Sequence, residues 1–324
     1  MDLNIVSIIY IMFGFIVGIV LIKPCLALLY KLKIGQKILE DTPESHQKKA
    51  GTPTMGGLIF LVADLIFCLI VLFLSYIKFV TLDMNILPTF IYPLFMGVIG
   101  AVDDYLTVHP KNGVRGIKSL PKALIQAAVT VIFVCWMAFS QEKQFCIFGL
   151  ELTGFWYVVA VSFIITGFVN FTNLTDGLDG LLGGIFCIVC LALGFMETVS
   201  VVMVGVVLAF LTTNSNPAKV FMGDTGSLFL GAYLMAFAFV RDLEWIIFIA
   251  SAWIILEGVS VIIQWIWFKI TKKIYGEGRR VFLMSPIHHH FEKKGYPEQK
   301  ITVNAIIITI ICSCVALLVY STVM

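Results

Sequence analysis

The sequence predicts an all-α, polytopic membrane protein with about ten transmembrane helices. Of its 324 residues, 60% are hydrophobic and only 13% are charged, whereas soluble domains carry about 25% charged residues. The apolar residues form continuous runs, unlike the alternating strands of outer-membrane barrels. Because a backbone inside a bilayer must satisfy its own hydrogen bonds, we expect these runs to be helices of a single membrane domain covering residues 1–324.

The spans follow from the apolar runs, at roughly 20 residues each. They are expected at 5–30, 56–77, 86–102, 122–139, 153–171, 180–196, 199–213, 226–240, 245–270 and 303–323. The first has no basic region before it and is predicted to be retained, not cleaved as a signal peptide. Most of the eight cysteines lie in apolar runs. The pair Cys187 and Cys190 is therefore interpreted as structural and not as a redox or metal pair.

The distribution of basic residues predicts the orientation. One set of loops holds Lys31, Lys33, Lys37, Lys48, Lys49, Lys111, Arg115, Lys118, Lys122, Lys219, Lys272, Lys273, Arg279, Arg280, Lys293, Lys294 and Lys300. The opposite set holds only Lys78, Lys143 and Arg241. Because cytoplasmic loops are enriched in Lys and Arg, the first set is predicted to be cytoplasmic. An even number of spans then places both termini on the extracytoplasmic side.

Every polar cluster of chemical interest falls in the predicted cytoplasmic loops. The clusters are residues 48–57, Asp103-Asp104, 173–179, 214–227 and 285–292. This one-sidedness favours an enzyme acting at the cytoplasmic face. A transporter would more often place its ionisable groups near the bilayer midplane, on broken helices related by an internal repeat, and no convincing repeat is found.

The stretch Asn173–Gly180 is a polar notch between two apolar runs. Asp176 and Asp179 would share one face if a helix has already begun there. Carboxylates at the edge of a bilayer are costly and their default interpretation is functional, while the alternative is a helix cap. Asp103 and Asp104 end the third predicted span and point about 100° apart on a helix. One of them could act as a general base, or both could be an acidic helix end beside basic residues.

Asp224 lies between two glycines at the start of the eighth predicted span. One carboxylate with open backbone and nearby hydroxyls suits Mg²⁺ and phosphate, and the alternative is a capped turn. His288, His289 and His290 are better suited to phosphate contact or proton transfer than to zinc. Carboxylates, histidines and the basic residues Lys49, Lys122, Arg279 and Arg280 at one face fit phosphoryl transfer to a lipid phosphate, although some of the basic residues could merely enforce the topology.

At these residues the chain resembles the polyprenyl-phosphate N-acetylhexosamine-1-phosphate transferases, and among them the phospho-N-acetylmuramoyl-pentapeptide transferase family. The resemblance extends over essentially the whole chain. It rests on the motifs at 51–57, 103–104, 173–180, 220–227, 257–264 and 284–292. It implies transfer of phospho-MurNAc-pentapeptide from UDP-MurNAc-pentapeptide to undecaprenyl phosphate, giving lipid I and UMP, with Mg²⁺ as cofactor. It also implies a homodimer in the bacterial inner membrane, with no nucleic-acid partner.

The resemblance further implies residue roles. Catalysis is implied for Asp103, Asp104, Asp224 and His289, and Mg²⁺ binding for Asp224. Substrate binding is implied for Lys49, Thr54, Lys122, Asn173, Asp176, Gly177, Leu178, Asp179, Asn214, Phe221, Gly223, Ser227, His288, His289 and His290. One departure is Thr107, which stands where the family usually has a lysine, so Lys111 could substitute. Asp64 and Glu257 lie inside spans and are expected to form interhelical hydrogen bonds.

Two functional alternatives and one mechanistic choice stay open at this point. The chain could be a sibling transferase that uses UDP-N-acetylglucosamine, or a transporter for Mg²⁺ or an organic anion. The attack on the sugar nucleotide could be direct or could pass through an aspartyl-phosphate on Asp103 or Asp104.

Overall fold

The computed structural model describes residues 3–32, 34–35, 51–79, 86–110, 116–140, 143–147, 150–194 and 198–323. Eight helices in these ranges are long and apolar enough to cross a membrane, and two shorter apolar helices, Leu181–Gly194 and Val199–Asn214, accompany them. The predicted all-α, polytopic fold is therefore confirmed.

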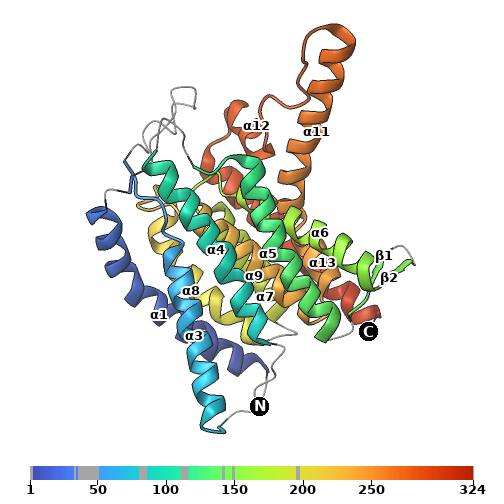
Figure 1. Ribbon diagram of the computed structural model, residues 1–324. Coiled ribbons are helices and arrows are strands. Elements are labelled where there is room, and N and C mark those ends of the chain that lie inside the picture. The colour runs from blue at the N-terminus through green and yellow to red at the C-terminus, as the bar shows by residue number, and fades with distance from the viewer. Residues whose placement is uncertain are drawn as a thin grey trace.

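The long helices pack beside one another in one bundle (Figure 1). They are α1 (Leu3–Lys31), α3 (Leu58–Tyr76), α4 (Leu87–Val108), α5 (Ser119–Ser140), α6 (Gly154–Thr175), α7 (Leu181–Gly194), α8 (Val202–Asn214), α9 (Gly223–Val240), α10 (Glu244–Ala250), α11 (Ala252–Tyr275), α12 (Ile287–Lys293) and α13 (Glu298–Val323), with a 3-10 turn at Thr198–Val201. Two short strands, β1 (Phe145–Ile147) and β2 (Leu150–Leu152), pair antiparallel. The all-helical prediction did not include this hairpin.

Helix α9 is the centre of the bundle. From Thr225 to Val240 every residue of α9 is buried, and α9 packs closely on α4 and α6. Close approach is possible because small residues meet at the crossings, as is common between membrane helices. A Cβ at Gly100 of α4 would collide with the backbone of Asp224, and one at Gly57 would collide with the backbone of Gly226. The first turn of α9 is therefore held against α4 and the start of α3.

Three predicted helix ends are wrong. Helix α4 continues to Val108, so Asp103 and Asp104 lie within its last two turns and do not end it. Helix α6 stops at Thr175 and α7 starts at Leu181, so Asp176 and Asp179 lie in the intervening turn and do not share a helix face. The expected span 245–270 is divided at Ser251, which ends α10 and precedes α11.

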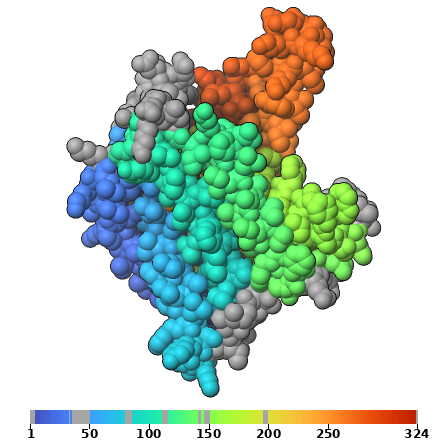
Figure 2. Space-filling view, in the orientation of Figure 1, coloured from blue at the N-terminus to red at the C-terminus, as the bar shows by residue number. Residues whose placement is uncertain are grey.

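The two ends of the bundle differ. Part of α11 projects beyond the rest of the molecule, next to α12 (Figures 1 and 2). Both chain termini lie toward the opposite end (Figure 1). This arrangement agrees with an even number of membrane crossings.

Candidate active site

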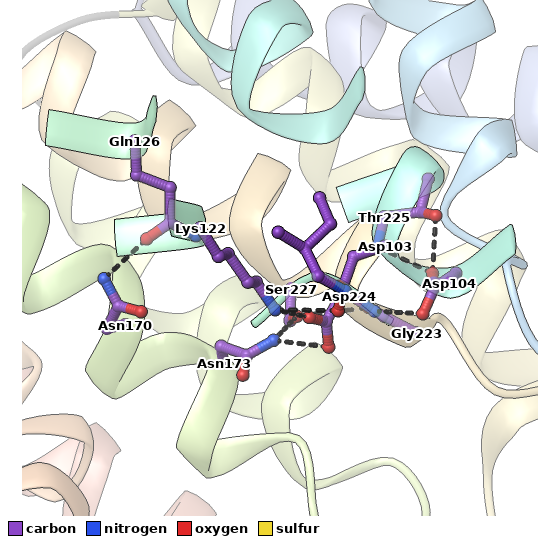
Figure 3. Close-up of polar contacts among 11 residues, drawn as sticks. Asp103, Asp104, Lys122, Gln126, Asn170, Asn173, Gly223, Asp224, Thr225 and Ser227 are labelled. Atoms are coloured by element: carbon purple, nitrogen blue, oxygen red, sulfur yellow. Dashed lines mark hydrogen bonds and ion pairs between the residues drawn. The ribbon is translucent and has the colours of Figure 1, made fainter. Parts of the chain in front are cut away.

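Four helices bring polar side chains together in one cluster, which we call the aspartate centre. Its members are Asp103 and Asp104 from α4, Lys122 from α5, Asn173 from α6 and Asp224 from α9 (Figure 3). Positions separated by up to 121 residues in sequence thus meet through helix packing. The structure brings together the three aspartates that the sequence analysis singled out as catalytic.

Lys122 connects two carboxylates of the centre, Asp103 and Asp224. Its Nζ donates a hydrogen bond to Asp103 Oδ2 at 3.0 Å and forms a second ion pair with Asp224 Oδ2. The other Asp103 oxygen accepts the backbone N–H of Ile117 at 2.6 Å. Because the Lys122 and Asp224 side chains are 17% and 25% exposed, this part of the centre is accessible to a ligand.

Asn173 holds Asp224 from the opposite side. Its Nδ2 donates to Asp224 Oδ1 and to Ser227 Oγ, both at 2.8 Å. Ser227 Oγ in turn donates to the carbonyl of Gly223 at 3.1 Å. The Asp224 carboxylate is thus oriented by an amide and an ammonium group, and Ser227 fixes the amide.

Asp104 is used differently from Asp103. Its Oδ1 accepts the N–H of Asp224 at 3.1 Å, and its Oδ2 accepts the N–H and the hydroxyl of Thr225 at 2.9 and 2.6 Å. These are donors of the first turn of α9, which have no partner inside their own helix. A carboxylate here also interacts favourably with the helix dipole. Asp104 therefore acts as a cap that ties α9 to α4.

The segment before α3 lies against the start of α9. The N–H groups of Gly56 and Gly57 donate to the carbonyls of Phe221 and Met222 at 2.8 and 3.0 Å, and the N–H of Phe221 donates to Pro53 O at 2.8 Å. Gly223 has φ +68, and a Cβ there would collide with Asp104 Oδ2 and contact Thr54 Oγ1. Thr54, Phe221 and Gly223 are therefore next to the aspartate centre, and their predicted contact with substrate stays a prediction.

The turn between α6 and α7 forms a second polar group. Asp179 Oδ2 accepts from Asn216 Nδ2 at 3.2 Å and from the N–H of Ala218 at 3.0 Å, and the N–H of Asp179 donates to Glu298 Oε1 at 2.6 Å. Asn214 Oδ1 accepts the N–H of Gly180 at 3.2 Å. Leu178 is buried within this turn. Asp179 and Asn214 thus join the turn after α6 to the end of α8 and the loop after it, and their predicted contact with substrate stays a prediction.

The histidines occupy α12 with three different partners. His288 is completely buried; its Nδ1 lies 3.0 Å from Glu257 Oε2 on α11, and its ring packs directly against Gly177. His289 Nδ1 lies 2.6 Å from Glu292 Oε2. His290 Nδ1 accepts the N–H of Leu283 at 3.0 Å, and partial desolvation and the positive charge of Lys294 lower the pKa of His290. The expected interhelical hydrogen bond of Glu257 is confirmed.

The buried His288–Glu257 pair predicts a stability effect. Glu257→Leu should lower the free energy of unfolding by about 1–3 kcal/mol, because His288 Nδ1 and N–H would lose their buried acceptor. Thermal unfolding in detergent measures the change. Ser260→Ala on the same helix is the control and should cost only about 0.5–1 kcal/mol, since Ser260 only bonds within its own helix. Equal destabilisation by both variants would contradict the role of this pair.

Three further residues of the sequence analysis that the structure describes, Arg279, Arg280 and Asp64, do not join these groups. Lys49 and Lys111 lie outside the described residues. Arg279 is exposed and pairs with Glu277 at 3.4 Å, while Arg280 donates to Leu283 O. Asp64 is fully buried, yet its carboxylate has no hydrogen-bond partner within the part of the chain that the structure describes. The interhelical bond expected of Asp64 is therefore wrong for these residues.

The sequence analysis missed one contributor to the centre, Thr225, and one hydrogen-bonded pair of helix residues near it, Gln126 and Asn170. Thr225 supplies two of the three hydrogen bonds to Asp104. Gln126, one turn after Lys122 on α5, accepts from Asn170 Nδ2 at 2.9 Å (Figure 3). A buried glutamine and an asparagine inside two adjacent apolar spans were a usable signal, because polar residues in membrane helices usually pair with each other.

Comparisons with known proteins agree on one family. Residues 86–241 match the family model described as glycosyl transferase family 4, and residues 49–61 match phospho-N-acetylmuramoyl-pentapeptide-transferase signature 1. Curated relatives named phospho-N-acetylmuramoyl-pentapeptide-transferase include one from Bacillus licheniformis, which is 38% identical over 91% of this chain and 91% of its own length. Another, from Prochlorococcus marinus, is 36% identical over 91% of this chain and 85% of its own. A third, from Picosynechococcus, is 40% identical over 85% of this chain and 76% of its own. This chain belongs to the phospho-N-acetylmuramoyl-pentapeptide-transferase family.

Proposed function

We propose that this enzyme transfers phospho-MurNAc-pentapeptide from UDP-MurNAc-pentapeptide to undecaprenyl phosphate, giving lipid I and UMP. The names of the relatives support phospho-MurNAc-pentapeptide as the transferred group, and the family resemblance supports the nucleotide donor and the lipid acceptor. The observation that carries the proposal is the Lys122 ammonium held between the Asp103 and Asp224 carboxylates in a membrane-embedded bundle. Such a centre of alternating charge suits the positioning and neutralisation of phosphates.

The chemistry is a displacement at phosphorus. An oxygen of the lipid phosphate forms a bond to the sugar-linked phosphorus, the bond from that phosphorus to the bridging oxygen breaks, and the electron pair leaves on UMP. Lys122 lies where its charge can neutralise the approaching phosphates, and Asp103 orients Lys122. Direct attack is favoured over an intermediate on Asp104, because both oxygens of Asp104 already accept hydrogen bonds from α9.

Mg²⁺ is proposed as the cofactor, held by Asp224. The donor set fits, because the Asp103 and Asp224 carboxylates already accept one cation, the Lys122 ammonium. Among the described residues no group of three His, Cys, Asp or Glu side chains could enclose a metal. Mg²⁺ is usually bound by one or two carboxylates together with waters and substrate phosphates, so a single carboxylate is sufficient. When bound, the metal would supply further neutralisation of the pyrophosphate charge.

The protein is proposed to lie in the inner membrane of a bacterium, with the aspartate centre facing the cytoplasm. The Lys- and Arg-rich loops support this orientation, because most basic loop residues belong to the set that includes Lys118 and Lys122. Both termini would then be extracytoplasmic. A homodimer is proposed from the family resemblance alone.

Release of UMP by the purified enzyme in detergent tests the proposal. Release that needs UDP-MurNAc-pentapeptide, undecaprenyl phosphate and Mg²⁺ together is the expected result. Activity with UDP-N-acetylglucosamine in place of the pentapeptide substrate would favour a sibling transferase. If folded protein released no UMP from either nucleotide sugar, the transferase proposal would fail, and flux into sealed vesicles would test the transporter alternative.

A further inference from the structure

An apolar groove lies on the bundle between α4 and α5. Its volume is about 330 Å³, within the size range of specific ligand pockets. Ile91, Tyr92 and Phe95 of α4 line one side, and Ile132, Phe133 and Trp136 of α5 line the other. The lining is almost entirely apolar, so the groove suits a hydrocarbon chain and not a sugar or a nucleotide.

The floor of the groove is preformed. The rings of Tyr92 and Phe133 stack with centroids 4.5 Å apart, and Trp136 stacks on Phe133 at 6.3 Å. The hydroxyl of Tyr92 forms a 3.0 Å hydrogen bond with Thr130 Oγ1, so it is satisfied without water. Tyr92 and Phe133 are 3% and 5% exposed. These rings therefore keep their positions, and a bound chain would not have to order them.

The groove is aligned with the aspartate centre. On α5, Lys122 shares one face with Val129, Phe133 and Trp136, because their spacing of seven, eleven and fourteen residues returns to the same side of a helix. At about 1.5 Å per residue, the groove begins roughly 10 Å from Lys122 along α5 and ends roughly 20 Å away.

An apolar stripe on α4 connects the two. Ile91, Phe95, Val98 and Val102 follow each other at helical spacing and are 44%, 56%, 50% and 47% exposed. The next residue, Asp103, belongs to the aspartate centre and points about 100° away from Val102, toward the side of α4 that carries Tyr92 eleven residues earlier. Because Tyr92 lines the groove, a chain that starts at Asp103 would run beside this stripe into the groove.

We propose that the groove between α4 and α5 binds the isoprenoid chain of the lipid acceptor while its phosphate lies at Lys122 and Asp103. This inference rests on the proposed function. An ordinary membrane lipid could fill an apolar groove anywhere on the bundle. A polyprenyl phosphate differs because it needs a charged site and an apolar channel in line, and α4 and α5 carry both.

Filling the groove with a larger side chain tests the proposal. Ile132→Trp should raise KM for undecaprenyl phosphate roughly tenfold and leave KM for UDP-MurNAc-pentapeptide unchanged, because lost apolar contact weakens only the acceptor. Val131→Trp is the matched control; it lies next along α5 but 100° around the helix, is 39% exposed, and should leave both constants unchanged.

Ile91→Trp fills the same groove from α4 and should also raise KM for undecaprenyl phosphate. This second variant keeps the test decisive if Ile132→Trp does not fold. Equal acceptor KM values for folded groove variants and the control would overturn the groove assignment while leaving the transferase intact. An equal rise for both substrates would also overturn it, because the groove would then act through the aspartate centre. If the wild-type enzyme released UMP without any polyprenyl phosphate, the proposed function would fail instead.

Discussion

Asp224→Asn is expected to lower the rate of UMP release by about 10³-fold while the protein stays folded. The substitution keeps the size of the side chain but removes the charge that pairs with Lys122. It would also remove the carboxylate proposed to hold Mg²⁺. The fold should survive because Asp224 is joined to Asp104 through its backbone N–H and not through its side chain.

The rate is measured with saturating substrates over a range of Mg²⁺ concentrations, and thermal unfolding reports the integrity of the fold. Asp242→Asn is the control, since the Asp242 side chain is 62% exposed and pairs with Lys143, away from the aspartate centre. Its rate should equal the wild-type rate. An Asp224→Asn enzyme within threefold of wild type would show that the metal and catalytic assignment of this residue is wrong.

Gly100→Ala should reduce turnover by about 10²-fold and destabilise the protein by about 1–3 kcal/mol. A Cβ at Gly100 would meet the backbone carbonyl of Asp224 and the backbone nitrogen of Thr225. Backbone atoms cannot rotate away as a side chain can, so α4 and α9 would have to separate. Asp103 and Asp104 would then move relative to Asp224, and small misplacements of reacting groups have large effects on rate.

Gly167→Ala on α6 is the matched control. A Cβ at Gly167 meets nothing within 4 Å, and alanine favours helix more than glycine does. This variant should keep its activity and should unfold at the same or a slightly higher temperature. If Gly100→Ala matched it in both rate and stability, close packing of α4 on α9 would not be needed to build the centre.

Much of the architecture was predictable from the sequence. Hydropathy predicted the membrane spans, because each span must bury its own backbone polar groups whatever its neighbours are. The motifs around Asp103, Asn173 and Asp224 identified three of the four helices that form the centre. Lys122 was predicted to bind the substrate, but nothing in the neighbouring sequence indicated which carboxylates it would pair with.

Only the tertiary structure decided which role each of these residues has. Asp103 and Asp104 are adjacent in sequence, yet one pairs with Lys122 and the other caps α9, because successive residues of a helix point in different directions. The division at Ser251 was also hidden, since hydropathy continues across it, whereas the polar notch at Asn173–Gly180 had already indicated the break after Thr175. The sequence by itself determined which charged and polar residues are costly to place at a membrane and are therefore functional candidates. The packing of α9 against α4 decided which residues they pair with, because hydrogen bonds between distant segments depend on the distance between helices and not on local composition.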